Sequence, residues 1–386
     1  MNSTCLGINF DKSGRCNFCK DFKIKNNLKL INRDKNSLNS LISKIKDYRK
    51  KNNNDYDCIV GLSGGIDSSY TLVKAVECGL RPLAVHLDNG WNSELAQNNI
   101  EKLIKELNVD FYTHVVKWTE FKGLMQSLFD ADVIDIELLT DNAMLAINYQ
   151  MAKKFRTPFI LAGTNSSTEG MKMPKNMNWF KFDKKNILSI NSKFTNTKIS
   201  TYPIMGIFDL IRYIAYDRIK WINFLDFFEY NKYSAEDELF QKFQFKKYKN
   251  KHYESVFTRF YQGYLLPKKF NVDKRILHLS TLIISEQISR NDAIEEISKS
   301  PYPSDELLEE DINYFLKKMN WEKEQLEVYL NRAPRSHKEY PNNYLLFNFP
   351  NPLLHPNSFP IYHQHILHHY NQIHRGCSRV CSSEYH

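Results

Sequence analysis

The chain has 386 residues, enough for two or three domains of roughly 100–200 residues each. Its composition is 42% hydrophobic and 25% charged, and 53 Lys and Arg against 44 Asp and Glu give a net charge of +9. No window approaches the ~18 apolar residues of a membrane span, and the start lacks the basic and apolar regions of a signal peptide. The seven cysteines are too sparse for a disulfide scaffold. Membrane, secreted and fibrous classes are therefore excluded. We expect a cytoplasmic protein whose mild basic excess favours anionic ligands.

The predicted elements begin with a stretch rich in Lys and Asn at residues 20–55. Its amphipathic part predicts a connecting helix, although compositional bias explains the Lys and Asn equally well. The apolar positions of that part are Leu38, Leu41, Ile42 and Ile45. Short apolar runs then predict strands at 56–62, 82–88, 110–116 and 157–163. Helical patterns lie between them at 68–77, 93–107 and 137–155.

This alternation predicts an α/β protein with a doubly wound parallel sheet and helices on both faces. Beyond about residue 205 the pattern becomes mostly helical and rich in aromatic residues. We expect this second region to pack on the first.

A glycine-rich loop joins the first strand to its helix, with the sequence GLSGGIDSS from Gly61 to Ser69. Gly64 and Gly65 allow a tight turn, after which the first N–H groups of the helix point at a ligand. The hydroxyls of Ser63, Ser68 and Ser69 add donors, so the loop is suited to an anion with several oxygens. It is neither a Walker A loop nor GxGxxG. A turn that only caps the helix is the alternative, and the complete SGGxDSS string argues against it.

The loop resembles the PP-loop of the ATP pyrophosphatases, whose fold is that of the adenine nucleotide alpha hydrolases. This resemblance implies that the loop holds the β,γ-pyrophosphate of ATP, which is split into AMP and pyrophosphate. Asp67 would then help to place Mg²⁺ or orient the pyrophosphate. Asp67, Ser63 and Ser68 are accordingly the catalytic candidates, and Ser63 to Ser69 without Ile66 are candidate ligands of ATP.

Further candidates follow the carboxyl ends of other strands, where open α/β sheets bind ligands. His86 and Asp88 end the second predicted strand, and Gly163, Thr164 and Asn165 follow the fourth. We expect these residues to contact ATP, and Glu169 to contact the group that is activated. For each residue alone, a loop side chain bonded to its own backbone is an equally good explanation. Asp141, inside the long helix, faces either the cleft or solvent.

A basic, aromatic-rich segment covers residues 251–275, with the sequence KHYESVFTRFYQGYLLPKKFNVDKR. Read alone, it indicates a solvated surface. Together with SGGIDSS, GTNSSTEG and GINFDKSGRCNFC, however, it resembles the N-acetyl sugar amidotransferases of the WbpG/PseA type, from about Gly7 to Tyr344. The resemblance implies conversion of a sugar acetamido group to an acetamidino group in surface polysaccharide (LPS O-antigen) or nonulosonate biosynthesis. ATP would form an adenylated imidate, which ammonia attacks. Candidate contacts of the nucleotide-linked or nonulosonate sugar are Glu169, Lys251, His252, Glu254, Arg259, Lys268 and Lys269.

The resemblance also divides the chain into four parts. They are a cysteine knuckle at 1–30, a PP-loop domain at 31–205, a mostly helical substrate or partner region at 206–344 and an atypical His-rich tail at 345–386. Family members begin with two CxxC pairs, which suit tetrahedral Zn²⁺. Here Cys16 and Cys19 form one pair with Cys5 nearby, so these three are the metal candidates, and we expect the native start to lie upstream. Cys377 and Cys381 in the tail have tolerable metal-ligand spacing, but a disordered or frame-shifted end explains the change of texture better.

Two other functions are considered. A PP-loop enzyme that adenylates and thiolates tRNA needs a cysteine pair near its cleft, and none lies between Cys78 and Cys377, so nucleic acid is not an expected partner. A non-catalytic nucleotide-binding protein is disfavoured by the intact SGGIDSS. No cysteine has the setting of a glutaminase nucleophile, because Asn2 follows Met1 and Cys5 is not terminal. We therefore expect ammonia to come from a separate glutaminase, similar to the glutaminase and cyclase pair of histidine biosynthesis.

Overall fold

The fold is built on one parallel sheet. The computed structural model describes residues 1–3, 5–30, 35–246 and 254–348. Its five strands run in the order β3-β2-β1-β4-β5, and every neighbouring pair is parallel. The strands are β1 (Cys58–Gly61), β2 (Pro82–Asp88), β3 (Asp110–Val115), β4 (Phe159–Ala162) and β5 (Lys220–Asn223). The predicted α/β class with a parallel sheet is confirmed.

The four predicted strands and three predicted helices between them are present, within two residues at each end. The helices are α3 (Ile66–Glu77), α4 (Glu94–Leu107) and α6 (Leu138–Lys154). The fifth strand was not predicted. Because β5 pairs with β4, the sheet continues past residue 205. Residue 205 was predicted as the end of the PP-loop domain, and that boundary stays a prediction.

The two faces of the sheet pack in separate apolar cores, because alternate residues of a strand point to opposite faces. Ile59 of β1 lies in one core, while Cys58 and Val60 lie in the other. The core that contains Cys58 is covered by α2 (Lys35–Asn52), α3, α4 and α10 (Lys232–Phe243). The core that contains Ile59 is covered by α5 (Trp118–Asp130), α6 and α8 (Lys184–Phe194), together with helices from the C-terminal part.

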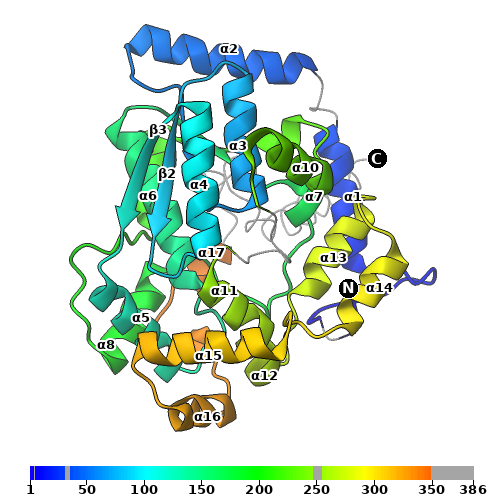
Figure 1. Ribbon diagram of the computed structural model, residues 1–386, viewed down its shortest axis with the longest axis vertical. Helices are drawn as coiled ribbons and strands as arrows, with labels where there is room; N and C mark the ends of the chain where they lie inside the picture. Colours follow the sequence, from blue (N-terminus) through cyan, green and yellow to red (C-terminus); the bar gives the residue numbers. More distant parts are fainter. Residues whose placement is uncertain (4, 31–34, 247–253, 349–386) are drawn as a thin grey trace, which may run out of the picture.

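The predicted helix in the Lys/Asn-rich stretch is confirmed as α2. Ile45 is completely buried, and Leu38, Leu41 and Ile42 pack partly buried against the same core. A separate helix, α1 (Asn17–Leu30), precedes it. In Figure 1, α2 lies across the top of the molecule.

The C-terminal part is mostly helical, as predicted. Its helices include α11 (Val256–Phe260), α12 (Leu266–Phe270), α13 (Arg275–Ile284), α14 (Arg290–Ser298), α15 (Asp305–Met319), α16 (Lys323–Asn331) and α17 (Tyr344–Asn348). Strands β2 and β3 point downward in Figure 1, so their carboxyl ends face the half that holds α11, α12 and α15. The two parts of the chain therefore meet at the edge of the sheet where ligands bind in this class of fold.

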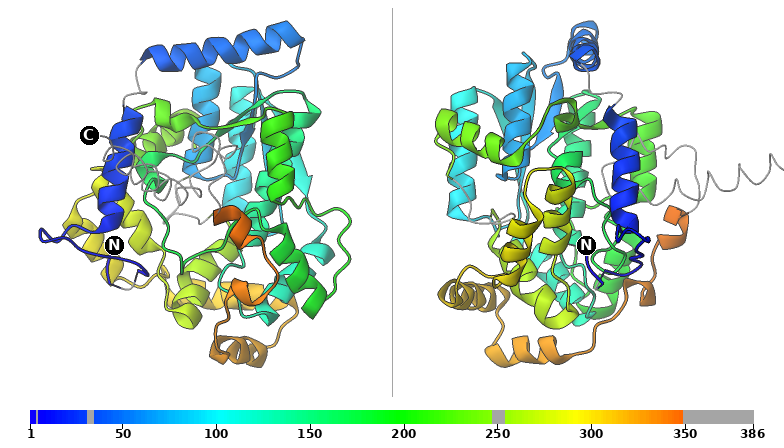
Figure 2. Two further views of the ribbon diagram at one scale, coloured as in Figure 1. Left: turned by 180° about the vertical axis from the view of Figure 1, so that it is seen from behind. Right: turned by 90° about the vertical axis from the view of Figure 1, so that its right-hand side faces the viewer.

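The N-terminal segment packs on the C-terminal helices. Phe18 and Phe22 of α1 share a small apolar core with Leu277 of α13 and with Met171. Both views in Figure 2 show α1, in dark blue, beside these yellow helices. The segment before the first strand thus contributes to the fold at a distance from the sheet. None of the helices within the described ranges is long and apolar enough to span a membrane.

Candidate active site

A cavity of about 1180 Å³ lies at the carboxyl ends of the strands. Its wall includes Ser63, Gly65, Asp67 and Ser68 from the loop between β1 and α3. Other wall residues come from the ends of β2 and β4, from α6 and from the C-terminal helices. The predicted loop site is therefore part of a space large enough for a nucleotide and a second ligand.

The serine side chains of the loop hold its shape. The Ser63 N–H donates to Ser68 Oγ (3.2 Å), and the Gly65 N–H donates to Ser63 Oγ (3.3 Å). The Ser68 hydroxyl donates to the Gly65 carbonyl (3.1 Å), and the two hydroxyl oxygens lie 3.0 Å apart. The turn is therefore preformed. Ser69, in contrast, is fully buried and is not part of the cavity wall.

Two glycines allow the backbone to come close at this turn. Gly64 has φ +86°, in the left-handed region that side chains rarely adopt. At Gly163, just after β4, an added Cβ would lie 2.7 Å from the Ser68 nitrogen. The end of β4 thus lies directly against the first turn of α3. Gly163 and Thr164 are both in the cavity wall, and Thr164 Oγ1 donates to Asn223 Oδ1 at 2.7 Å.

Asp67, in the first turn of α3, is held by residues from two other segments. The hydroxyl of Thr168 donates to Asp67 Oδ2 at 3.1 Å, and the hydroxyl of Tyr230 donates to Oδ1. Burial and the Asp67 carboxylate together raise the pKa of Tyr230 well above its usual value, so Tyr230 remains a donor. Asp67 therefore presents a fixed carboxylate to the cavity.

The short helix α7 (Ser166–Glu169) supplies part of this support. Asn165 accepts from the Thr168 N–H (2.9 Å) and donates to the Thr168 hydroxyl (3.0 Å), which fixes the hydroxyl that bonds to Asp67. Asn165 is fully buried and outside the cavity wall, whereas Glu169 is in it. Asn165 thus acts through Thr168 rather than on a ligand directly.

His86, on β2, lies 6% exposed in the cavity wall. Its Nδ1 is 2.7 Å from the Leu62 carbonyl, and its Nε2 is 2.9 Å from the Asn92 amide nitrogen. Only a neutral ring with its proton on Nδ1 satisfies both contacts, and burial lowers the pKa of His86 accordingly. Asp88 is not in the cavity wall; its carboxylate accepts from the Gly90 N–H at 2.8 Å and holds the turn.

A group of ion pairs, which we call the Asp141 cluster, lies at another part of the cavity. Its members Glu137, Asp141, Lys181 and Lys274 line the cavity, whereas Asp135 is buried and is not in the wall. Lys181 Nζ lies between Asp135 Oδ2 (2.7 Å) and Asp141 Oδ2 (2.8 Å). Glu137 accepts from Lys274 Nζ (2.7 Å) and from the Gln262 amide (3.0 Å). The sequence pattern did not single out these residues, apart from Asp141, whose direction is now known.

Comparison with known protein families gave two matches. Residues 37–172 match a family described as NAD synthase, and residues 254–352 match one described as "LPS biosynthesis protein WbpG-like, C-terminal domain". The first match contains the loop between β1 and α3. The second contains C-terminal residues that line the same cavity. The chain therefore combines a part that matches the NAD synthase family with a WbpG-like C-terminal domain.

Comparison with solved structures gave several distant likenesses, of which three are described. NMN synthetase from Francisella tularensis has 18% identity, covers 56% of this chain and 97% of its own, and has a TM-score of 0.29. The U34-tRNA thiolase NcsA from Methanococcus maripaludis has 12% identity, coverages of 74% and 83%, and a TM-score of 0.34. Glutamine-dependent NAD+ synthetase from Acinetobacter baumannii has 18% identity, coverages of 65% and 52%, and a TM-score of 0.29. Likenesses with such low TM-scores do not identify the function of this chain. A search of curated proteins gave no match.

The WbpG-like part reaches the loop through Glu254 and Ser255. The Glu254 carbonyl accepts from the Ser93 N–H (2.9 Å), and Ser255 forms a β-bridge with Asn92. An added Cβ on Gly65 would lie 3.3 Å from Glu254 Oε1, so this carboxylate is next to the loop. Glu254 was predicted to contact the substrate, and it lies in the cavity wall, where such a contact can form.

The basic residues of this part have mixed positions. Arg259 is in the cavity wall but forms a two-bond ion pair with Asp311, at 2.6 and 2.7 Å. Lys269 is buried away from the cavity, where its Nζ lies 3.0 Å from Asp132 Oδ1 and also bonds to backbone carbonyls. Lys268 is exposed and outside the cavity wall. Lys269 is therefore structural in this arrangement. Lys251 and His252 lie outside the described residues.

The predicted zinc site of the WbpG-like chain is not supported. Within the described ranges, no group of three or more His, Cys, Asp or Glu side chains is placed to hold a metal. Cys5 packs with Met177 and Val272, whereas Cys16 and Cys19 belong to a different apolar core. Burial, with Cys16 alongside, raises the pKa of Cys19 to about 11, which favours the neutral thiol. The tail from 349 onward, with its His and Cys residues, lies outside the described part of the chain.

Proposed function

We propose that this protein is an ATP-dependent amidotransferase that converts a sugar acetamido group to an acetamidino group. The observation that supports it is that the PP-loop and the WbpG-like segment line one cavity, with Glu254 beside Gly65. A PP-loop enzyme of LPS biosynthesis is the coarser statement that the family matches carry. The specific reaction, its sugar and a role in O-antigen or nonulosonate synthesis belong to this proposal.

The reaction needs the acetamido oxygen to become a leaving group. That oxygen attacks the α-phosphorus of ATP, the bond to the β,γ-pyrophosphate breaks, and an O-adenylated imidate forms. Ammonia then bonds to the imidate carbon, and the C–O bond to AMP breaks. The products are the amidine, AMP and pyrophosphate. Each step trades one bond for another, so no oxidant or reductant is required.

The loop suits the pyrophosphate part of this step. Its preformed turn directs N–H groups at the start of α3 toward the cavity, and the helix dipole favours an anion there. Asp67 and Glu169 both offer carboxylate oxygens at the cavity wall, the donor type that Mg²⁺ prefers. Mg²⁺ bound there would neutralise charge on the departing pyrophosphate. Asp67 would hold Mg²⁺, while Ser63 and Ser68 hold the loop and neutral His86 fixes the end of β1 through Leu62.

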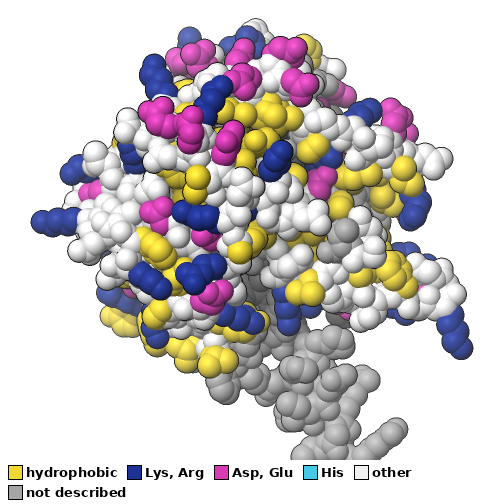
Figure 3. All heavy atoms as spheres, turned by 90° about the horizontal axis from the view of Figure 1, so that it is seen from below, with side chains coloured by type: hydrophobic (Ala, Val, Ile, Leu, Met, Phe, Trp, Pro, Cys, Tyr) yellow, Lys and Arg dark blue, Asp and Glu magenta, His cyan; other side chains and the backbone are white. Residues whose placement is uncertain are grey.

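The tRNA-modifying alternative is not favoured by the cavity. A sulfur-transfer enzyme of this superfamily needs cysteine thiols near the reacting base. No cysteine is among the cavity-lining residues in the described part of the chain. On the face seen from below in Figure 3, basic, acidic and apolar side chains are interspersed, which is not the continuous basic surface expected for nucleic acid.

Ammonia is proposed to come from a separate glutaminase. Cys58 is completely buried in β1, and burial raises the pKa of its thiol well above the usual value, so it does not have the properties of a nucleophile. Cys5 is also buried. The isolated chain is therefore expected to use ammonium and not glutamine.

The test is incubation with ATP, Mg²⁺, ammonium and a panel of UDP- and CMP-linked acetamido sugars, followed by mass spectrometry. One sugar of the panel should yield an amidine together with AMP and pyrophosphate. Glutamine in place of ammonium should yield none. Pyrophosphate release that requires tRNA instead of a sugar would overturn the proposal.

A further inference from the structure

Asp141 lies in the cavity wall on α6, and the same helix also contacts the first residue of the loop. Asn148 of α6 packs against Gly61, where an added Cβ would lie 3.0 Å from its side chain. Asp141 is two turns earlier on α6, a rise of roughly 10 Å. Its neighbour Thr140 accepts from the amide of Asn89, which follows β2. Asp141 is therefore close enough to the loop for a single nucleotide-sized ligand to reach both.

The cluster carries an unbalanced negative charge. Among the described residues, the carboxylates of Asp135, Glu137 and Asp141 form ion pairs with two ammonium groups, those of Lys181 and Lys274. The side chain of Asp141 is 26% exposed, compared with 1% for Asp135 and 10% for Glu137, so the excess charge is presented to the cavity by Asp141. Asp135 Oδ1 is also buried and has no hydrogen-bond partner within the described residues. In a chain with a net charge of +9, this acidic wall is suited to a cationic ligand.

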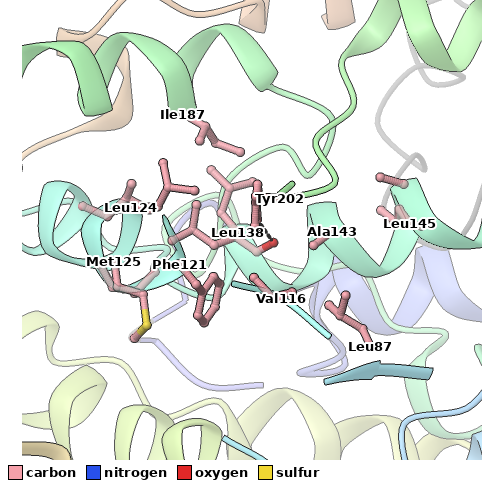
Figure 4. Close-up of a cluster of buried hydrophobic side chains, with 14 of the residues drawn as sticks. Leu87, Val116, Phe121, Leu124, Met125, Leu138, Ala143, Leu145, Ile187 and Tyr202 are labelled. Carbon is pink, nitrogen blue, oxygen red and sulfur yellow. Dashed lines mark hydrogen bonds between the residues drawn. The ribbon is translucent and has the colours of Figure 1, made fainter. Parts of the chain in front are cut away.

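The helix that carries Asp141 is held firmly. The hydroxyl of Tyr202 donates to the Leu139 carbonyl, and Figure 4 shows Tyr202 packed beside Leu138 at the start of α6. Asn142 donates to the Lys181 and Met205 carbonyls, each at 2.7 Å. Because Asn142 bonds to the backbone of Lys181, Asp141 and Lys181 keep their relative positions.

The charged and titratable groups around Asp141 come from several segments. They are Asp135, Glu137, Lys181, Tyr202, Lys274 and His337. Although part of the Asp141 side chain faces the cavity, desolvation by the surrounding protein raises its pKa, and Glu137 and Asp135 add to this, while Lys181 opposes it. The net effect makes Asp141 a better proton acceptor than an exposed carboxylate.

We propose that Asp141 is a catalytic residue of the second half-reaction, which takes a proton from ammonium and then pairs with the amidinium product. This inference rests on the proposed function. Ammonium gives one proton to the Asp141 carboxylate and becomes ammonia, which bonds to the imidate carbon as the C–O bond to AMP breaks. One hydrogen of the bound ammonia moves to the imidate nitrogen, which gives the amidinium. The Asp141 carboxyl gives its proton to the departing phosphate of AMP and is again a carboxylate when it pairs with the amidinium. The acetamido substrate is neutral and the acetamidino product is a cation. An acidic wall at this place therefore favours ammonium and product over the starting amide.

The test compares two nucleophiles in Asp141→Asn. Amidine formation from ammonium should fall by roughly 10²-fold or more, the usual contribution of a general base. Hydroxylamine is largely neutral at pH 7 and needs no such base, so its product should form within a few-fold of the wild-type rate. Pyrophosphate release with sugar alone should also be retained, which shows that the first half-reaction and the fold are intact.

The matched control is Asp217→Asn. Asp217 also pairs with a lysine of α6, Lys153, at 3.1 Å, but it is outside the cavity wall. This variant should behave as wild type. Should Asp141→Asn lose the first half-reaction as well, Asp141→Glu and Asp141→Gln replace it, and only the Glu variant should use ammonium.

Three results decide the matter. Equal loss with both nucleophiles, or no loss with ammonium, overturns the role of Asp141. Equal behaviour of the Glu and Gln variants overturns it too. Failure of the wild-type protein to form any amidine overturns the proposed function itself, which is a separate outcome.

Discussion

Asp67 is the residue on which the proposed pyrophosphate step depends most directly, since its carboxylate is fixed at the cavity wall by two hydroxyl donors. Asp67→Asn keeps the size of the side chain and removes its charge. Pyrophosphate release should fall roughly 10²–10³-fold, the usual effect of removing one group that stabilises the transition state electrostatically. Circular dichroism should be unchanged. Turnover within twofold of wild type would contradict the assignment.

Tyr230 acts on Asp67 from outside the predicted motif. Its hydroxyl bonds to one carboxylate oxygen and should hold that oxygen in the orientation that binds Mg²⁺. In Tyr230→Phe the Mg²⁺ concentration for half-maximal pyrophosphate release should rise roughly tenfold, as for other groups that orient a metal ligand. A purely structural role would instead lower the melting temperature and leave the Mg²⁺ dependence unchanged.

At the scale of elements, the contact between the end of β4 and the start of α3 shapes the site. Gly163→Ala would place its Cβ 2.7 Å from the Ser68 nitrogen, so one element must move. We expect a loss of about 1–3 kcal/mol in the free energy of unfolding, measured with urea, and loss of pyrophosphate release. Gly206→Ala is the control, since Gly206 has φ −115° and is outside the cavity wall. A Gly163→Ala protein with full activity would show that this close approach is not required.

The elements differ in how well their sequences predict them. Strands β1, β2 and β4 are buried apolar runs, whereas β3 is largely exposed, and all four were predicted to within two residues. The strand β5 was missed because its four residues, Lys220–Asn223, begin and end with polar side chains and are too few to show a strand pattern. The loop between β1 and α3 can also be predicted from the local sequence, because its turn needs glycine at fixed positions.

The rest of the site depends on contacts far apart in the chain. Tyr230 is one of 22 tyrosines, with no local feature to mark it, and it bonds to Asp67 across a separation of 163 residues in the chain. The Asp141 cluster likewise joins α6 to Lys181 and Lys274. Conversely, Lys269 is a basic residue of the type that binds anionic ligands, but its side chain is buried against Asp132. Motif residues were therefore predicted, and the residues that support them were not.

At the scale of the whole molecule, His337 connects the last described segment to the first half of the chain. Its ring lies between the Asp135 N–H (3.3 Å) and Asn186 Oδ1 (2.7 Å) and stacks on Trp179. Burial lowers its pKa from 6.5 to about 3. Between these pH values the unfolded chain binds a proton that the folded chain does not. The contribution of neutral His337 to the free energy of unfolding is therefore complete above pH 6.5 and is lost as the pH falls toward 3.

This gives a prediction for pH-dependent stability. Urea unfolding at pH 7 and pH 5 should show a decrease in the free energy of unfolding that is roughly 1–2 kcal/mol larger in wild type than in His337→Gln. His86 also has a lowered pKa, but its contribution is common to both proteins and cancels. Equal decreases in the two proteins would show that His337 is not a neutral buried ring.

Residues from both family matches line the cavity. We propose that ATP activates an acetamido oxygen there. The most direct measurement uses a sugar with a heavy-oxygen label in its acetamido group, ammonium, ATP and Mg²⁺. The account predicts that each amidine formed leaves the label in AMP, because the C–O bond to the adenylate is the bond that breaks. Amidine formation with the label in pyrophosphate or inorganic phosphate, or with none in AMP, would contradict it.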